Sequence, residues 1–271
     1  METTDDVTEP TDGRPKEVAG AQTLFRALNV LDCFIEVGPV LSLKEISDRV
    51  GLTVPTTHRL VRALISRDMV VVDRHRRYSL GPAVMRLASV IMHRSEDLAA
   101  VVAPTLLRLR DETGETTSLH SLVGHERVCI TEFVSPQPIR MESRVGRAYP
   151  LYAGAAGKAI LAWAPELQPE VMRQLEAVGP STITDPDALR KELTLIVKRG
   201  YAESNSETVA GAAAVAAPLF DSTGRVLAAI NIAGPSSRFT REKARSAREA
   251  LLREVSSAMR LLASLAPTAG G

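Results

Sequence analysis

Two short helices with marked starts and ends follow each other closely near the N-terminus, and they constrain the fold more than any other feature. Residues 42–45 read Ser-Leu-Lys-Glu, the capping box in which a Ser hydroxyl and a Glu carboxylate bind free backbone amides at a helix start. Gly51 follows where that helix must end, because glycine adopts the left-handed conformation at low cost. Thr53 is the predicted N-cap of the next helix, with Pro55 tolerated in its first turn. The sequence therefore predicts a helix-turn-helix.

The segments on either side of these two helices complete a small domain. Upstream, apolar residues at steps of four, three and four from Leu24 to Ile35 (through Leu28 and Leu31) predict an amphipathic helix that ends at a Gly-Pro pair. Downstream, residues 69–72 and 78–80 predict two short strands joined by the basic turn Asp-Arg-His-Arg-Arg. The order helix, helix, turn, helix, hairpin predicts a winged helix-turn-helix domain over residues 21–81.

Charge is unevenly distributed, although the whole chain carries a net charge of only +1. Residues 1–20 carry six acidic side chains against two basic ones, and their apolar-poor composition predicts a disordered acidic tail. Residues 21–95 carry eleven Arg and Lys side chains against six Asp and Glu, a net charge of +5, and the remainder balances. Positive charge gathered on a helix-turn-helix is expected where a polyanion binds, so we predict duplex DNA as a partner.

Helix geometry divides the second helix of the motif into a packed and an outward face. At 100° per residue, Thr57 and Leu60 fall on the packed side and Arg59 on the opposite side. We expect Thr56 and Arg59 to contact base edges, because a guanidinium can pair bidentately with guanine, and the basic side chains of the wing to contact phosphates. The predicted DNA-binding set is Arg26, Thr53, Pro55, Thr56, His58, Arg59, Arg62, Arg74, Arg76 and Arg77. Any one of these arginines taken alone is better explained as solvated surface, whereas the set together favours DNA.

The rest of the chain predicts one larger α+β domain over residues 95–265, preceded by a linker helix over 82–94 and followed by a flexible tail at 266–271. Alternating apolar residues predict two hairpins of one antiparallel sheet, with strands at 117–123, 128–134, 215–220 and 226–232. Helices are expected at 95–112, 154–163, after the Asp-Pro pair at 185–186 and at 240–265. The predicted fold class is thus α+β with two domains.

Several protein classes are disfavoured by what the sequence lacks. Cys129, His120 and Glu132 could form a catalytic group on the first hairpin, but no G-x-S-x-G, P-loop or HExxH accompanies them, so we predict no enzyme and no cofactor. His58 and His75 have no Cys or carboxylate cluster at ligand spacing, which disfavours a metal. Two distant cysteines, no signal segment and no apolar stretch long enough to span a bilayer predict a soluble, cytoplasmic protein without a membrane partner.

Several motifs together resemble the IclR family of bacterial regulators, and the resemblance runs from Gln22 to Leu265. Residues 43–52 with Thr-Thr-His-Arg-Leu at 56–60 are similar to its helix-turn-helix. Pro-Leu-Tyr-Ala-Gly-Ala-Ala-Gly-Lys-Ala at 150–159 and Asn-Ile-Ala-Gly-Pro at 231–235 are similar to its C-terminal signatures. The resemblance implies a GAF-like effector-binding domain, a homodimer or tetramer, and a pseudo-palindromic operator.

The family's effector contacts, carried onto matching positions, fall at Ala155, Ala156, Ser204, Ala214, Asn231 and Ala233. The chain has small apolar residues where relatives often have charged or hydroxyl groups, so we expect a small-molecule effector with an apolar or aromatic body. We predict that its carboxylate binds backbone N–H groups at the helix start from Gly154 to Gly157. Cys129 is a further candidate for the pocket lining, although a small core hydrophobe is the better-supported interpretation of it. Tight packing explains each alanine equally well, and a DNA-binding oligomerisation protein without a ligand remains the alternative function.

Overall fold

The computed structural model describes residues 21–265, with the side-chain surroundings of 89–97 and 265 excepted. The predicted tails at 1–20 and 266–271 lie outside the described residues. The chain forms two compact units that divide between Val90 and Ile91.

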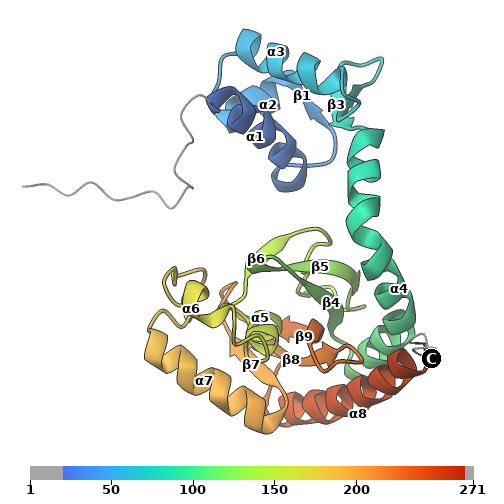
Figure 1. Ribbon diagram of the computed structural model, residues 1–271, viewed down its shortest axis with the longest axis vertical. Helices are drawn as coiled ribbons and strands as arrows, with labels where there is room; N and C mark the ends of the chain where they lie inside the picture. The colour runs from blue at the N-terminus through green and yellow to red at the C-terminus, as the bar shows by residue number, and fades with distance from the viewer. Residues whose placement is uncertain (1–20, 266–271) are drawn as a thin grey trace, which may run out of the picture. The chain divides into compact units, whose positions relative to one another are not determined.

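The N-terminal unit packs three helices against a small antiparallel sheet of order β1-β3-β2 (Figure 1). This is the predicted winged helix-turn-helix, in which β2 and β3 form the wing. The strand β1 was not predicted, because it has two residues and its pairing partner, Tyr78, lies far along the chain. The elements are α1 (Gln22–Glu36), β1 (Leu41–Ser42), α2 (Leu43–Val50), α3 (Val54–Ile65), β2 (Val70–Val72) and β3 (Arg77–Leu80).

Local capping chemistry fixes α2, as the sequence predicts. Both bonds of the capping box are present: the Glu45 amide donates to the Ser42 hydroxyl, and the Ser42 amide donates to the Glu45 carboxylate at 2.6 Å. Gly51 ends the helix with φ of +65°, a conformation that a side chain would strain. The turn between the two helices is therefore set by residues adjacent to it.

The predicted apolar stripe of α1 is only partly buried. Val30, Cys33 and Phe34 enter the core and Leu31 packs against them, whereas Leu24 and Ile35 are 60% and 57% exposed. The helix carries apolar residues on more than one face, and the periodicity of the sequence does not show which of them faces α2 and α3. The helix itself lies where it was expected.

A single helix, α4 (Pro82–Thr113), stands where two helices were predicted at 82–94 and 95–112. The predicted break rested on Ser95 as a helix start. No glycine or proline occurs between residues 83 and 103, so nothing in the sequence interrupts the helical hydrogen bonds there. The boundary between the two compact units falls inside this helix.

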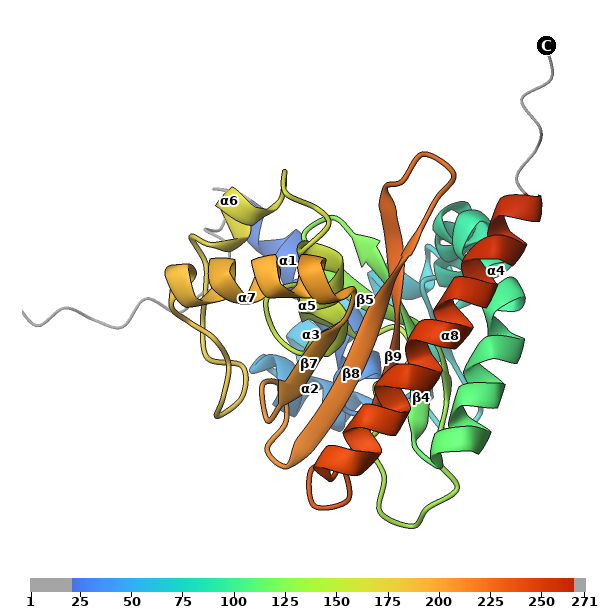
Figure 2. The same ribbon diagram turned by 90° about the horizontal axis from the view of Figure 1, so that it is seen from below.

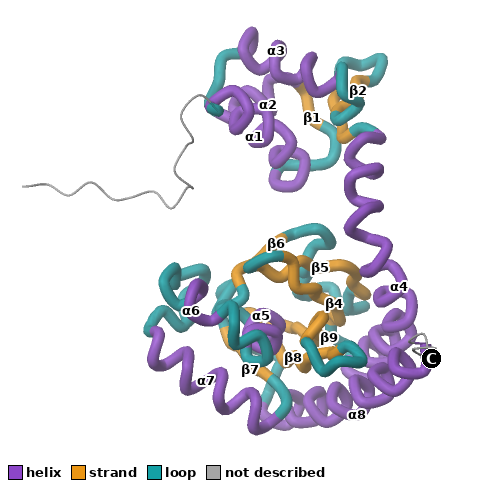
Figure 3. Tube along the Cα trace, viewed as in Figure 1, coloured by secondary structure: helices purple, strands orange, loops and turns teal. Residues whose placement is uncertain are grey.

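The C-terminal unit is built on a six-stranded antiparallel sheet of order β6-β5-β4-β9-β8-β7 (Figure 3). The two predicted hairpins, β4-β5 and β8-β9, form its centre and pair with each other through β4 and β9. The two edge strands are short and were not predicted. The strands are β4 (Thr116–Val123), β5 (Glu126–Phe133), β6 (Ala148–Pro150), β7 (Ala202–Asn205), β8 (Ala212–Phe220) and β9 (Val226–Pro235).

Helices cover both faces of this sheet (Figure 2). The C-terminal part of α4 and α8 (Arg241–Leu265) lie on one face, where Leu106, Leu251 and Ile230 share a buried cluster. On the other face α5 (Ala155–Leu161), α6 (Gln168–Val171) and α7 (Pro186–Arg199) form a second cluster. Because strand residues alternate between faces, Ile230 enters the first cluster and Asn231 faces the side that carries α5.

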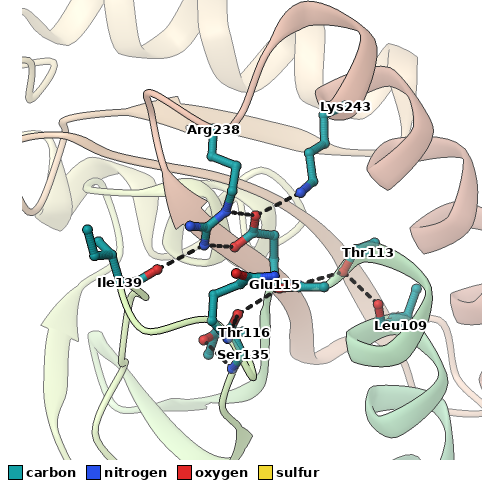
Figure 4. A network of polar contacts seen from close by, with 10 residues as sticks. Leu109, Thr113, Glu115, Thr116, Ser135, Ile139, Arg238 and Lys243 are labelled. Carbon is teal, nitrogen blue, oxygen red and sulfur yellow. Dashed lines mark hydrogen bonds and ion pairs between the residues drawn. The ribbon is translucent and has the colours of Figure 1, made fainter.

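A buried carboxylate joins three separate segments at one end of the sheet (Figure 4). Glu115 is fully buried, and Arg238 binds both of its oxygens at 2.7 Å while Lys243 lies 3.1 Å away. Burial alone would raise the pKa of Glu115, but the hydrogen bonds and positive charges of Arg238 and Lys243 outweigh it and lower that pKa. Arg238 also donates to the Ile139 carbonyl at 3.0 Å, which ties a loop to the same point.

Candidate DNA-binding face and effector pocket

The outward face of α3 has the composition that the sequence predicts. Thr57, Leu60 and Val61 are buried against the rest of the domain, whereas the predicted DNA-contacting residues on the opposite side are exposed to solvent. These exposed residues are Pro55, His58, Arg59 and Arg62. The helix therefore presents two guanidinium groups one turn apart on a surface free to meet a ligand.

Thr53 occupies the predicted N-cap position of α3 but does not cap the helix with its side chain. Its hydroxyl instead lies 2.9 Å from the hydroxyl of Thr56. The half-buried Thr56 is therefore held at the start of the helix, next to the end that a helix-turn-helix directs toward base edges.

The wing is shaped by Asp73, whose carboxylate accepts the backbone N–H groups of His75 and Arg77 at 2.8 Å each. These hydrogen bonds lower the pKa of Asp73 below its ordinary value. Arg74 and Arg76 are exposed at the turn, and Arg76 adopts a positive φ of 58°. The turn thus presents two arginines to solvent.

Arg77 has protein partners that the sequence did not predict. Its guanidinium donates to the Val40 carbonyl at 2.8 Å and lies 3.5 Å from the Glu45 carboxylate, so it binds the wing to the body of the domain. The prediction treated the turn as a uniform basic tip, but Arg77 begins strand β3 and its side chain is already engaged. Arg26, the remaining predicted DNA contact, is half-buried on α1.

The C-terminal unit contains a pocket of about 70 Å³ between the sheet and the start of α5, which is space for several water-sized groups. Seven of the eight predicted effector positions line it, although they come from four elements and from the turn before α5. They are Gly154, Ala155, Ala156, Ser204, Ala214, Asn231 and Ala233. Their contact with a ligand stays a prediction.

Cys129 is the predicted position that does not line the pocket. It is fully buried, its thiol lies 3.7 Å from the Thr131 carbonyl oxygen, and burial raises its pKa to about 12. The thiol is therefore a packed, unreactive side chain. Cys129 lies on the same face of β5 as Arg127, which lines the pocket, but two residues further along the strand and outside the pocket.

The start of α5 is occupied by the protein's own carboxylate. Glu207 accepts the Gly154 N–H at 3.0 Å and binds the buried ammonium of Lys158 at 2.5 Å. The Gly154 N–H is thus already bound, and a ligand carboxylate at this helix start would have to use the remaining backbone N–H groups of residues 155–157. Gly154 has φ of +79°, and a Cβ there would lie 3.1 Å from a guanidinium nitrogen of Arg127, so a larger residue would crowd that side chain.

Arg127 is the charged group in the pocket wall that the predictions missed. It is 6% exposed, its Nη1 donates to His120 Nδ1 at 2.9 Å, and its guanidinium lies 4.5 Å from the centre of the Tyr149 ring. Its Nε has no hydrogen-bond partner, and it forms no ion pair with any described residue. Burial lowers the pKa of Arg127 to about 10, which still leaves it charged at neutral pH.

A line of hydrogen bonds continues from Arg127 beneath the pocket. His120 Nε2 lies 3.0 Å from the Ser118 hydroxyl, which in turn accepts the side-chain amide of Asn231 at 3.4 Å and lies 3.3 Å from the Ser143 hydroxyl. Burial and the charge of Arg127 both disfavour imidazolium, so the pKa of His120 is well below its ordinary value. His120 is therefore neutral, and it accepts from Arg127 through Nδ1.

Comparison with known proteins decides the family. A profile described as the IclR helix-turn-helix domain matches residues 23–74, and one described as bacterial transcriptional regulator IclR C-terminal matches residues 91–260. The chain belongs to the IclR family. Its members are DNA-binding transcriptional regulators and not enzymes, so the predicted family, fold class and broad function are confirmed.

This IclR-family chain is similar to named regulators along most of its length. It is 35% identical to the HTH-type transcriptional regulator BhcR of Paracoccus denitrificans, over 83% of this chain and 81% of that protein. It is 32% identical to the HTH-type transcriptional repressor AllR of Escherichia coli K12, over 86% and 88%. An IclR homologue of Microbacterium hydrocarbonoxydans solved with 4-hydroxybenzoate superposes with a TM-score of 0.70, at 27% identity, over 89% of this chain and all of that one.

The side chains that suggested catalysis have other partners in this IclR-family regulator. The ring nitrogens of His120 bind Arg127 and Ser118, not Cys129, and a Glu132 oxygen accepts the Ser143 N–H. Within the described ranges, no group of three or more His, Cys, Asp or Glu side chains could hold a metal ion. No helix in that part of the chain has the length and apolar character needed to cross a bilayer.

One sequence signal could have located Arg127. It stands two residues before Cys129 on β5, so the alternation that assigned Cys129 to the pocket face also assigns Arg127 to it. A charged side chain on the buried face of a central hairpin is unusual unless it is paired or functional. The regulator therefore carries a polar pocket wall within a strand that otherwise reads as apolar core.

Proposed function

We propose that this IclR-family regulator binds a pseudo-palindromic DNA operator through α3 and the wing, and that a small carboxylate in the C-terminal pocket changes its operator affinity. The observation that carries the proposal is the convergence of seven expected effector positions, separated by up to 79 residues from Gly154 to Ala233, on one pocket. A ligand changes DNA binding only if it binds the two states of the protein with different affinity.

The exposure of the α3 and wing arginines supports a division of labour on DNA. Arg59, in the middle of α3, is proposed to read a guanine edge, and Thr56 one turn before it to contact a neighbouring base. Arg62, Arg74 and Arg76 are proposed to bind phosphates, which adds affinity and salt dependence but little sequence preference. Arg77 is assigned a structural role in the wing because its guanidinium is already bound.

A pseudo-palindrome requires two copies of the DNA-binding unit, and we propose that the protein is a homodimer or a dimer of dimers. The exposed apolar stripe of α1, formed by Leu24, Leu28 and Ile35, supports this. An isologous dimer buries the same surface of each copy and spaces two recognition helices about one turn of DNA apart. A protein that binds a chromosomal operator acts in the cytoplasm of a bacterium.

The pocket supports an effector that combines a carboxylate with an apolar or aromatic body. Its wall includes Met141, Val209 and several alanines beside the polar groups. The Microbacterium homologue is bound to 4-hydroxybenzoate, a compound of this kind. Because AllR is named a repressor, we propose repression relieved by the effector as the direction of regulation.

The DNA half of the proposal is tested by selecting duplexes from a random library with the full-length protein. We expect the selected sites to share an inverted repeat. Arg59→Ala should then weaken binding to that site by about 1–3 kcal/mol and broaden one base preference in each half-site. Arg59→Lys, the matched control, should keep the affinity for unrelated DNA and lose the preference. Selection of no common sequence, or an Arg59→Ala variant equal to wild type, would contradict the proposal.

The effector half is tested by a thermal-shift screen of aromatic and short-chain carboxylic acids on the full-length protein. A ligand that binds only the folded state raises the melting temperature by mass action. Each positive acid is then titrated into the complex with the selected duplex. A change in operator affinity is the expected result; if no compound changes it, the protein is the DNA-binding assembly factor that the alternative describes.

A further inference from the structure

We propose that Arg127, held in place by His120, is the anion receptor of the pocket and the residue that makes the regulator select a carboxylate over its uncharged analogue. This inference rests on the proposed function, because it assigns the recognition of the effector's charge in the same pocket. It adds a side-chain anchor to the expected backbone N–H groups of residues 154–157, of which the Gly154 N–H is already accepted by Glu207.

The first argument is that Arg127 is buried without an ion-pair partner among the described residues: the negative charge of Glu207 acts on it from a distance, but Glu207 itself is bound to Lys158. Only 6% of it is exposed, and its neighbours within hydrogen-bond distance are neutral: the His120 imidazole accepts one N–H and the Tyr149 ring covers one face. Its Nε has no partner, although the side chain lines a pocket that solvent can enter. A buried charge is costly unless it is paired, so an anion in the pocket would supply the ion-pair partner that the protein itself does not give to Arg127.

The second argument is that the acids near Arg127 are already committed elsewhere. Glu207 gives one oxygen to the Gly154 amide and the other to Lys158. Glu132 accepts the Ser143 amide. Glu142, which lines the pocket, is exposed and binds Arg140 at 3.0 Å. None of these carboxylates forms an ion pair with Arg127, so the charge of the guanidinium stays available for a ligand.

The third argument is the direction of the hydrogen bonds beneath the pocket. A guanidinium can only donate, so His120 accepts at Nδ1 and, being neutral, donates from Nε2 to Ser118. The Ser118 hydroxyl also receives the Asn231 amide, and its own proton is therefore directed to Ser143. The Ser143 hydroxyl, which lines the pocket, is left with a proton to donate. Arg127 and Ser143 both present donors, which match the acceptor oxygens of a carboxylate and repel an amine.

The experiment compares acids with amides of the same shape on the full-length protein. The probes are 4-hydroxybenzoate with 4-hydroxybenzamide, and pyruvate with pyruvamide, followed by melting temperature and calorimetry at low salt. We expect at least one acid to bind wild type more tightly than its amide. Arg127→Met should weaken that acid about 10- to 100-fold and remove the preference, because charge-assisted hydrogen bonds are lost.

A second variant and a matched control separate recognition from folding. Arg127→Lys keeps the charge and should retain a reduced preference for the acid. Arg147→Met removes another arginine that contacts the Tyr149 ring, at 4.9 Å, but is exposed and does not line the pocket, so the acid response should equal that of wild type. In the absence of acid, Arg127→Met should melt at or above the wild-type temperature, because it removes an uncompensated buried charge.

Three results would overturn the inference: an Arg127→Met variant that still prefers the acid, a wild type that binds acids and amides alike, or a wild type that responds to no acid. These results differ from failure of the proposed function. An amide that shifts operator affinity leaves the effector role intact and removes Arg127 as anion receptor. An acid that binds through Arg127 without changing operator affinity leaves Arg127 as the anion receptor and removes the proposed effector role.

Discussion

The two units of this regulator use positive charge in opposite ways. On the N-terminal unit Arg59, Arg74 and Arg76 are exposed to solvent, where their charges stay hydrated and salt screens them. In the C-terminal unit Lys158 and Arg127 are almost fully buried, where each needs specific partners. Exposed cations suit a long polyanion that offers charge at many points, whereas a buried cation suits one small anion in one position.

The comparison also separates what each charge contributes to folding. A surface ion pair stabilises by about 0–1 kcal/mol, whereas breaking a buried pair costs about 3–5 kcal/mol because a charge is left in a low dielectric. The stability of the C-terminal unit should therefore depend on individual charged residues, and that of the N-terminal unit should not. Three substitutions along this gradient of burial test the contrast.

The largest effect is expected for Lys158→Met. This change leaves Glu207 buried without the ammonium 2.5 Å away, so unfolding free energy should fall by about 3–5 kcal/mol. Denaturant unfolding of the full-length protein measures it. Lys198→Met, at an exposed position in the last turn of α7, is the matched control and should change stability by less than about 0.5 kcal/mol. Equal losses in the two variants would break the comparison.

A smaller effect is expected for Glu115→Gln, because its partners Arg238 and Lys243 are partly exposed and can be solvated once the charge is removed. The unfolding free energy should fall by about 2 kcal/mol at pH 7. The pKa of Glu115 is lowered in the folded state, so its contribution is present above the ordinary value of 4.5 and is lost as pH falls through the folded pKa.

Unfolding curves of wild type and Glu115→Gln measured from pH 7 to pH 3 should therefore converge at the acid end. Glu112→Gln breaks the exposed pair with Arg253 and serves as control, with an expected loss below about 1 kcal/mol. A difference between wild type and Glu115→Gln that widens as pH falls would show that the sign of the linkage is opposite to the one inferred.

The smallest effect on stability is expected for Arg76→Gln, which should stay within about 0.5 kcal/mol of wild type because the side chain is exposed. Its effect should appear in the salt dependence of operator binding: the plot of log association constant against log salt concentration should become less steep by about 1. Arg77→Gln sharpens the test: it breaks the bond to Val40, so it should destabilise the wing and leave the slope nearly unchanged.

Elements with local start and stop signals could be predicted from the sequence, and those set by distant partners could not. Local signals act on neighbouring backbone groups, so the helix ends that they mark were predicted correctly. These signals are the capping box at Ser42, Asp185 at the start of α7 and Gly200 at its end. The short strands β1, β6 and β7 exist only because a distant strand pairs with them. For α4 the error was the opposite: a helix end was predicted near residue 94, where no helix-breaking residue is present and the helix continues.

The candidate sites show the same difference between features set by local sequence and features set by distant residues. The outward face of α3 follows from helical periodicity, and the family resemblance supplied six of the sixteen residues that line the pocket. The sequence did not reveal that Arg77 binds Val40 and lies close to Glu45. Cys129 occupies the buried position that was the alternative to a place in the pocket wall. The network from Arg127 through His120 to Asn231 joins three strands, and no single segment contains it.

The sequence by itself determined the winged helix-turn-helix, the antiparallel hairpins and the concentration of positive charge in the first unit, because caps, periodicity and composition act over a few residues. Only the tertiary structure decided which apolar residues of α1 are buried, which of the predicted DNA-contacting arginines have protein partners, and that Arg127 lies in the pocket wall without an ion-pair partner among the described residues. Those outcomes depend on solvent exclusion and on hydrogen-bond partners brought together from distant parts of the chain, which local sequence patterns do not encode.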